Sequence, residues 1–126
     1  MTKVEDIFNE LCSYAPLNLQ MGFDNSGFLL GRKNSVVNKV LLALDVTPAV
    51  VEEASELEAE LIISHHPLIF SPLKSVTDEK LLKLAEKKIN VISMHTNLDI
   101  APGGVNDALA EALRIEDPGP LPGDAD

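Results

Sequence analysis

The sequence predicts an α/β domain with a mostly parallel sheet, βαβ units and flanking helices. Apolar segments at residues 39–46, 61–64 and 91–94 alternate with segments whose apolar residues recur at helical spacing. Such alternation along a chain is typical of a parallel sheet covered by helices. With 126 residues, the chain is long enough for one compact domain with its own core. We assign this domain to residues 1–115.

The first predicted helix covers residues 3–14, where apolar residues recur every three or four positions and the pattern stops before Pro16. These apolar residues are Val4, Ile7, Phe8, Leu11 and Cys12. We expect the single cysteine, Cys12, to lie buried in the core. A turn at residues 24–27, with the sequence Asp-Asn-Ser-Gly, and a short strand at residues 28–30 follow.

The segment 39–46 is predicted to be the first long strand, and almost every residue in it is apolar. That pattern is typical of a strand covered on both faces, so we expect it to be central in its sheet. Thr47 and Pro48 then supply an N-cap residue and a first-turn proline for a helix that runs to about Leu57. Strand, cap and helix together begin a βαβ unit.

The pattern then repeats, with a short buried strand at residues 61–64, a helix at residues 77–88 and a strand at residues 91–94. A last helix begins after Gly104 and has apolar side chains on one face: Val105, Ala108, Leu109, Ala112 and Leu113. Residues 116–126 contain four acidic residues, three prolines and two glycines. Because this composition buries little apolar surface, we expect an acidic Pro/Gly-rich tail.

The charge and composition of the chain limit the partners and the compartment that we expect for it. Ten basic against twenty acidic residues give a net charge of −10, which disfavours direct binding of nucleic acid. The chain has neither an apolar run near the roughly 20 residues needed to span a membrane nor the layout of a signal peptide. A single cysteine is typical of a reducing compartment. We therefore expect a cytoplasmic protein without a membrane partner.

All three histidines of the chain come just after predicted strands. His65 and His66 follow one strand directly, and His95 follows the next. Because the carboxyl ends of parallel strands meet at one edge of a sheet, we expect the three imidazoles to face the same crevice. Asp99 comes four residues after His95, and Asp45 ends the first long strand at the same edge.

Imidazole and carboxylate groups are the ligands that Zn, Mn, Fe and Ni bind in proteins. Adjacent side chains in an extended segment point in opposite directions, so His65 and His66 can serve two metal ions, or one metal and a supporting residue. Two metals would activate a bridging water as a nucleophile, which is the chemistry of a hydrolase. In the alternative interpretation the histidines are structural and donate to backbone carbonyls. Asp45 fits a capping or turn role better than a ligand role, and the segment 24–27 fits a turn.

Two segments, Ser64-His65-His66-Pro67-Leu68-Ile69-Phe70 and His95-Thr96-Asn97-Leu98-Asp99, resemble motifs of the NGG-one-interacting-factor-three-like family, whose bacterial members are often named type-two GTP cyclohydrolase I. Four more segments agree in the family's order: residues 15–17, 24–28, 44–47 and 103–106. The resemblance implies a site for two divalent ions (Zn, Fe, Mn or Ni), with His65, His66 and Asp99 as metal ligands. It implies a catalytic role for His95 beside the metals, as a proton carrier or a substrate contact.

The chain resembles the N-terminal half of the family only, and Phe23 stands where the family usually has Trp. In the family, a second half supplies a further His and Glu to the same metals. The resemblance also implies a homo-oligomer, since family members form rings that are trimers of dimers. Two functions therefore stay open. One is a hydrolase that attacks a nucleotide or heterocyclic metabolite by metal-bound hydroxide, and the other is a non-catalytic metal-binding or protein-interaction module.

Overall fold

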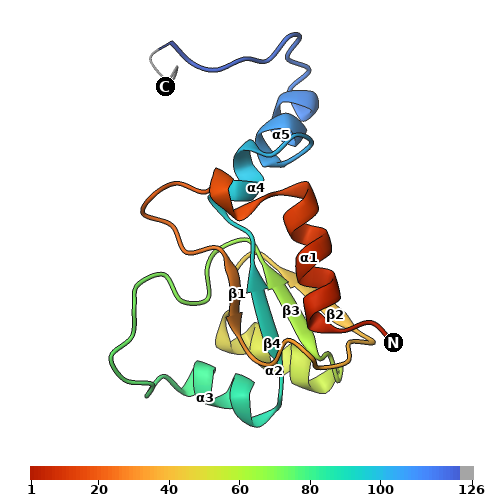
Figure 1. Ribbon diagram of the computed structural model, residues 1–126, viewed down its shortest axis with the longest axis vertical. Coiled ribbons are helices and arrows are strands. Elements are labelled where there is room, and N and C mark those ends of the chain that lie inside the picture. Colours follow the sequence, from red (N-terminus) through yellow and green to blue (C-terminus); the bar gives the residue numbers. More distant parts are fainter. Residues whose placement is uncertain (123–126) are drawn as a thin grey trace.

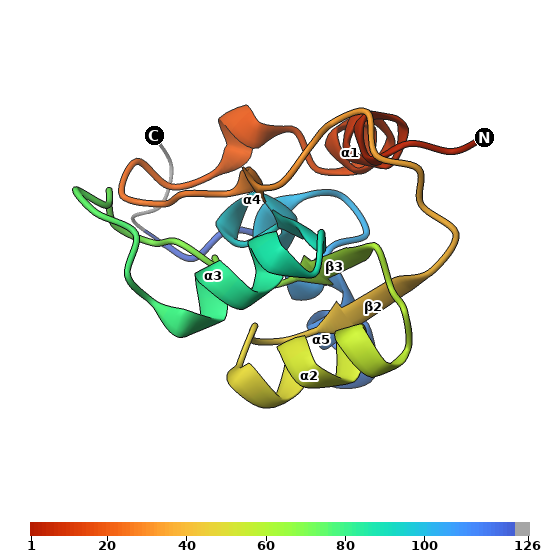
Figure 2. The ribbon, with the colours of Figure 1, turned by 90° about the horizontal axis from the view of Figure 1, so that it is seen from below.

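A four-stranded sheet lies between two layers of helices in the computed structural model, which describes residues 1–122 (Figures 1 and 2). The strand order is β1-β4-β3-β2. Strands β2 (Val40–Ala43), β3 (Leu61–Ser64) and β4 (Asn90–Ser93) are parallel, and β1 (Gly27–Leu30) is antiparallel to β4. The predicted α/β class, with a mostly parallel sheet and flanking helices, is confirmed.

Helices α2 (Pro48–Glu56) and α3 (Glu79–Glu86) pack on one face of the sheet (Figure 2). Each begins at the cap that the sequence supplies. Thr47 Oγ1 accepts a hydrogen bond from the Val50 amide at 3.2 Å, and Asp78 Oδ1 accepts one from the Lys80 amide at 2.8 Å. The side chains buried between these helices and the sheet form one core cluster that includes Val51, Ala54, Ile62, Leu81, Leu84 and Val91.

Helix α1 (Val4–Tyr14) and the 3₁₀-helix η1 (Leu17–Leu19) cover the opposite face. Their buried side chains pack against β3 and β4 in a second cluster that includes Val4, Ala15, Leu61, Ile92 and Met94. The prediction that Cys12 lies in the core is wrong, since its side chain is half-buried and belongs to neither cluster. Partial burial still raises the pKa of the Cys12 thiol.

The prediction that the segment 39–46 forms a central strand is also wrong. Strand β2 is four residues long and lies at the edge of the sheet, next to β3. Leu41 and Ala43 pack against the α2 side, whereas Leu42 and Leu44 point the other way and are 72% and 60% exposed. The cluster beneath α1 includes no residue of β2. An apolar run can thus form an edge strand when the helix layer on one face is too narrow to reach it.

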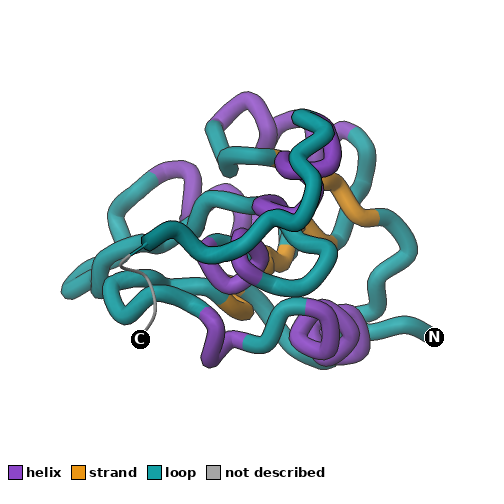
Figure 3. The backbone as a smooth tube through the Cα atoms, turned by 90° about the horizontal axis from the view of Figure 1, so that it is seen from above, coloured by secondary structure: helices purple, strands orange, loops and turns teal. Residues whose placement is uncertain are grey.

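After β4 the chain forms a short helix that the sequence did not predict, α4 (Thr96–Ile100), and then the expected α5 (Val105–Ala112). Both lie at the end of the sheet toward which β3 and β4 point (Figure 1), and Figure 3 shows the backbone from that end. The apolar stripe of α5 is largely uncovered, with Leu109 57% and Leu113 63% exposed.

Residues 116–122, at the start of the expected tail, form neither helix nor strand, and residues 123–126 lie outside the described residues. The boundary between domain and tail therefore stays a prediction. Within residues 1–122, no helix is long and apolar enough to cross a membrane.

Candidate metal centre

The three histidines meet at the carboxyl ends of β3 and β4. His65 and His66 follow β3 directly, and His95 is the N-cap residue of α4. The ring centroids of His65 and His95 are 5.3 Å apart, and the ring of His66 lies 5.5 Å from each of the other two. One ring nitrogen from each histidine lies within 4.8 Å of the others. The structure thus brings together the three imidazoles, which the sequence predicted to lie at one edge of the sheet.

Asp99 lies beside this group, in the first turn of α4. Its Oδ1 atom is 3.3 Å from Nε2 of His65, and its side chain is 30% exposed. The segment 96–100 forms a helix after the N-cap at His95, and one helical turn separates the two residues. This turn brings the carboxylate back toward the cluster, so the four predicted site residues lie in one place.

The hydrogen bonds of His65 fix which of its nitrogens carries a proton. Nδ1 of His65 lies 2.8 Å from the backbone carbonyl oxygen of Met94. A carbonyl oxygen accepts hydrogen bonds and never donates, so Nδ1 must carry the hydrogen. Nε2 is then the nitrogen left for a ligand, and it is the atom that faces Asp99.

A chain of buried hydroxyls shapes the turn that carries His66. The Ser64 hydroxyl donates to the His66 carbonyl at 2.9 Å, which leaves a lone pair of Ser64 to accept from the Ser93 hydroxyl at 2.8 Å. Oγ of Ser93 in turn accepts from the Leu68 amide at 3.2 Å. Because both hydroxyls are buried, each bond satisfies a group that water cannot reach. This network ties the ends of β3 and β4 to the loop beyond His66.

His66 has a carboxylate partner on the exposed side of the site. Its Nδ1 atom lies 2.6 Å from Oδ1 of Asp45, and the two side chains are 46% and 54% exposed. The His66 amide donates to the Leu44 carbonyl at 2.9 Å, so the backbone holds the end of β3 beside the residue that precedes Asp45. The structure therefore places Asp45 against a histidine, in addition to its position before the cap of α2.

His95 has a carboxylate partner in the interior. Nδ1 of His95 lies 2.9 Å from Oδ1 of Asp24, whose side chain is 0% exposed. Oδ2 of Asp24 accepts from the Thr96 amide at 2.9 Å and from the Thr96 hydroxyl. Burial alone raises the pKa of the Asp24 carboxyl, but the hydrogen bonds from Thr96 and His95 outweigh burial and hold this pKa well below its usual range.

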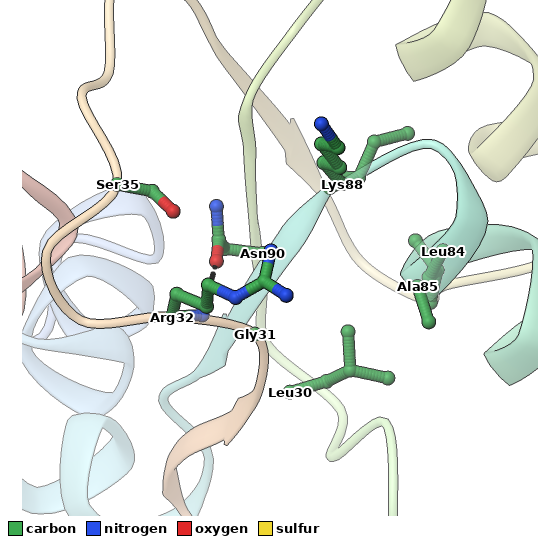
Figure 4. A pocket seen from close by; sticks show the side chains of 9 residues that line it. Leu30, Gly31, Arg32, Ser35, Leu84, Ala85, Lys88 and Asn90 are labelled. Carbon is green, nitrogen blue, oxygen red and sulfur yellow. Dashed lines mark hydrogen bonds between the residues drawn. The ribbon is translucent and has the colours of Figure 1, made fainter.

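Of two hollows in the structure, one borders the histidines and the other lies at the far end of the sheet. An apolar hollow of about 130 Å³ borders His65 and is lined by side chains from α1, β3 and α4, among them Leu11, Tyr14 and Leu98. A hollow of about 200 Å³ lies at the opposite end of β4, between Arg32, Lys88 and Asn90 (Figure 4). Oδ1 of Asn90 accepts from the Arg32 amide there at 2.7 Å. The histidine cluster and the basic hollow are therefore at opposite ends of the sheet.

Comparison with known proteins identifies the family of this chain. The model of Duf34/NIF3 (NGG1p interacting factor 3) matches residues 2–123. The chain belongs to the Duf34/NIF3 family. It is 44% identical over 116 residues to a protein of Clostridium perfringens named "GTP cyclohydrolase 1 type 2 homolog", and 47% identical over 109 residues to a protein of the same name in Halalkalibacterium halodurans. The family resemblance predicted from the sequence is confirmed.

Solved structures of Duf34/NIF3 relatives have the same fold. The Bacillus cereus protein related to NIF3 superposes with a TM-score of 0.87 at 42% identity, over 93% of this chain and 34% of its own. Reduced HcgD from Methanocaldococcus jannaschii superposes with a TM-score of 0.89 at 35% identity, over 94% of this chain and 50% of its own.

The present chain spans only part of its Duf34/NIF3 relatives. The match covers 88% of this chain but 44% of the Clostridium perfringens protein, and 82% of this chain but 29% of the Halalkalibacterium halodurans protein. These shares agree with the prediction that the chain corresponds to one half of a family member.

The sequence pattern predicted the clustered histidines of this Duf34/NIF3 chain, but it assigned Asp24 to a turn and did not predict its contact with His95. The turn lies earlier than predicted, over residues 21–24, where the Asp24 amide donates to the Met21 carbonyl at 3.0 Å, and Gly27 already begins β1. The pairing of β1 with β4, with Gly27 opposite Ser93, places the residues before Gly27 beside those after Ser93. That antiparallel pairing is the signal that would have brought Asp24 to His95.

Proposed function

We propose that this chain binds divalent metal at the histidine cluster and contributes to a hydrolase of the dinuclear-metal type. His65, His66 and Asp99 are the proposed metal ligands, and His95 is the proposed catalytic group beside them. Zn, Fe, Mn and Ni suit a set of imidazoles and a carboxylate.

The observation that carries the proposal is the contact between His65 and Asp99. Nδ1 of His65 donates to a carbonyl, so its Nε2 lone pair faces a carboxylate oxygen at 3.3 Å. Two electron-pair donors at this distance repel each other unless a cation joins them, which is either a proton on Nε2 or a metal ion. Ligand atoms of one tetrahedral zinc lie about 3.3 Å apart, given bond lengths of about 2.0–2.1 Å. The donor pair therefore fits a metal.

The supporting contacts have the form expected around a metal-binding histidine. Metal-bound imidazoles usually donate their other N–H to a carbonyl or carboxylate, which fixes the ring and its tautomer. Here His65 meets the Met94 carbonyl, and His66 and His95 meet carboxylates. When bound, a divalent metal would supply Lewis acidity and would activate water for attack on the phosphorus of a phosphoryl group or on a carbonyl-like carbon. The names of the relatives point to a nucleotide or another heterocyclic metabolite as the substrate class.

Metal content tests the proposal directly. The full chain is purified without chelator, and its metal is measured by elemental analysis before and after incubation with Zn²⁺, Mn²⁺, Fe²⁺ or Ni²⁺. We expect bound metal in the wild type and loss of it in His66→Ala and Asp99→Ala, while Asp78→Ala, at the cap of α3, keeps it. Absence of metal under all four conditions would contradict the proposal.

A non-catalytic metal-binding or protein-interaction module is the second candidate, because the chain spans 44% or less of the curated relatives described above. In that case the chain binds metal weakly and turns over no nucleotide by itself. Turnover of GTP, followed by chromatography of the products, separates the two. Turnover that disappears in His66→Ala supports the hydrolase, and metal binding without turnover supports the module.

We also propose that the chain forms a homo-oligomer. Strand β2 is an edge strand with exposed apolar side chains, and both features favour association. Light scattering on the full chain measures its mass, and a monomer at all concentrations would contradict this proposal. Trimers of dimers, like the cytoplasmic location, stay predictions.

A further inference from the structure

The Asp24 carboxylate is surrounded by donors from two separate segments. Oδ1 accepts from the amide of Asn25 at 2.8 Å and faces Nδ1 of His95 at 2.9 Å. Oδ2 accepts from the Thr96 amide at 2.9 Å, from the Thr96 hydroxyl, and from the Ser26 hydroxyl at 3.4 Å. Since the side chain is 0% exposed, water does not compete for these positions.

This arrangement determines the state of His95. An ionised carboxylate has no hydrogen to donate, so the contact at Oδ1 requires a hydrogen on Nδ1 of His95. Nε2 is then unprotonated in the neutral ring and is the nitrogen left for the cluster. His95 thus resembles His65, in which a carbonyl forces the same tautomer.

The loop around Asp24 also holds the two histidine segments to each other. The Ser26 hydroxyl accepts from the His95 amide at 3.1 Å, and the Asn25 side chain donates to the Ile69 carbonyl at 2.6 Å. Ile69 lies in the loop that follows His66. The segment 24–26 therefore contacts the loops after both β3 and β4.

We propose that Asp24 is a positioning residue, which holds His95 in the Nδ1-protonated tautomer and so presents Nε2 to the cluster formed with His65 and His66. The purpose of this arrangement rests on the proposed metal function, but the tautomer itself does not. The carboxylate is needed because one oxygen serves Thr96 while the other serves His95.

The substitution Asp24→Asn separates these two tasks. An amide NH₂ cannot accept from a backbone amide, and each oxygen of Asp24 does so, Oδ1 from Asn25 and Oδ2 from Thr96. Because Oδ2 also accepts from the Thr96 and Ser26 hydroxyls, we expect the side-chain oxygen of Asn to take the Oδ2 position. The NH₂ group then faces His95, whose Nδ1 must accept, and the hydrogen of the ring moves to Nε2. Asp45→Asn is the matched control, because solvent can replace the partner of the exposed His66.

The test is nuclear magnetic resonance of the full chain with ¹⁵N-labelled histidine, freed of metal, at about pH 8, which is above the pKa of about 6.5 of a free imidazole. Long-range ¹H–¹⁵N correlations show which ring nitrogen carries the hydrogen, and His→Gln variants assign the signals. We expect Nδ1–H for His95 in the wild type and Nε2–H in Asp24→Asn. His65 is the internal reference and should keep Nδ1–H in both, and Asp45→Asn should leave His95 unchanged.

Two results would overturn the proposal: Nε2–H for His95 in the wild type, which needs no variant, or an unchanged His95 tautomer in folded Asp24→Asn. Titration with Zn²⁺ then examines the purpose separately. If the tautomer changes as expected but the wild type binds no metal, the proposed metal function fails while the role of Asp24 stands. If the wild type binds metal and Asp24→Asn binds it about 10–100-fold more weakly, both stand.

Discussion

Asp24 and Asp45 each approach the Nδ1 atom of a clustered histidine, but the fold surrounds the two carboxylates differently. The Asp45–His66 contact is the shorter, at 2.6 Å against 2.9 Å for Asp24–His95, yet both of its side chains are about half exposed. Asp24 is shielded from water and has donors from Asn25 and Thr96 as well. Within residues 1–122, Asp45 has His66 as its one side-chain partner. We therefore expect burial and the number of partners, rather than bond length, to decide how firmly each carboxylate holds its histidine.

The largest expected difference between the pairs is in stability. Asp24→Ala leaves several buried donors without an acceptor, and we expect it to lower the free energy of unfolding by about 2–4 kcal/mol. Asp45→Ala should lower it by no more than about 0.5 kcal/mol, because water replaces the lost partner. Urea denaturation of the metal-free proteins measures both. Equal losses in the two variants would show that the burial difference has no energetic weight.

The next difference is in metal affinity. If the cluster binds metal as proposed, Asp24→Asn should weaken Zn²⁺ binding about 10–100-fold, as is typical when a partner of a metal-site histidine is removed. Asp45→Asn should weaken it by less than about tenfold, since His66 keeps a solvated Nδ1–H. Competition with a metal-binding dye measures the two dissociation constants. A larger loss in Asp45→Asn than in Asp24→Asn would reverse the ranking.

The third effect of Asp24 is expected in the dependence of stability on pH under acidic conditions. The lowered pKa of Asp24 means that the folded state binds this proton more weakly than the unfolded chain, in which Asp titrates near about 3.9. The stabilisation by this carboxylate is therefore present above that value and is lost as pH falls toward the folded-state pKa. Asp24→Asn should flatten the dependence of unfolding free energy on pH between about 5 and 2. A wild-type slope in folded Asp24→Asn would contradict this assignment.

The smallest effect is expected outside the pairs, on the open face of β2. Leu42 is 72% exposed, so Leu42→Ser should change the free energy of unfolding by less than about 0.5 kcal/mol and leave metal affinity unchanged. Leu61→Ala, in the fully buried position on the neighbouring strand, is the matched comparison and should cost about 2–5 kcal/mol. A large loss in Leu42→Ser would show that a partner covers this face.

Much of this fold and site could be predicted because it depends on local sequence patterns. The cap at Thr47 and Pro48 located α2, and the histidines that follow β3 and β4 had to meet at one edge because parallel strands end together. The edge position of β2 depended on the width of the α1 layer, which no local pattern encodes. Asp24 lies 71 residues from His95 and reaches it through the β1–β4 pairing, which is a long-range contact. Long-range strand pairing of this kind could not be predicted from the single sequence.

The most direct test of the proposed metal centre follows the imidazole nitrogens during a titration of the metal-free full chain with Zn²⁺. We expect the ¹⁵N signals of Nε2 in His65 and His66 to shift together at the same metal-to-protein ratio, while their Nδ1 atoms keep their hydrogens. The same titration of Asp99→Ala should need a higher Zn²⁺ concentration. Unchanged Nε2 signals at saturating Zn²⁺, or shifts confined to Nδ1, would contradict the claim that these histidines form a metal site.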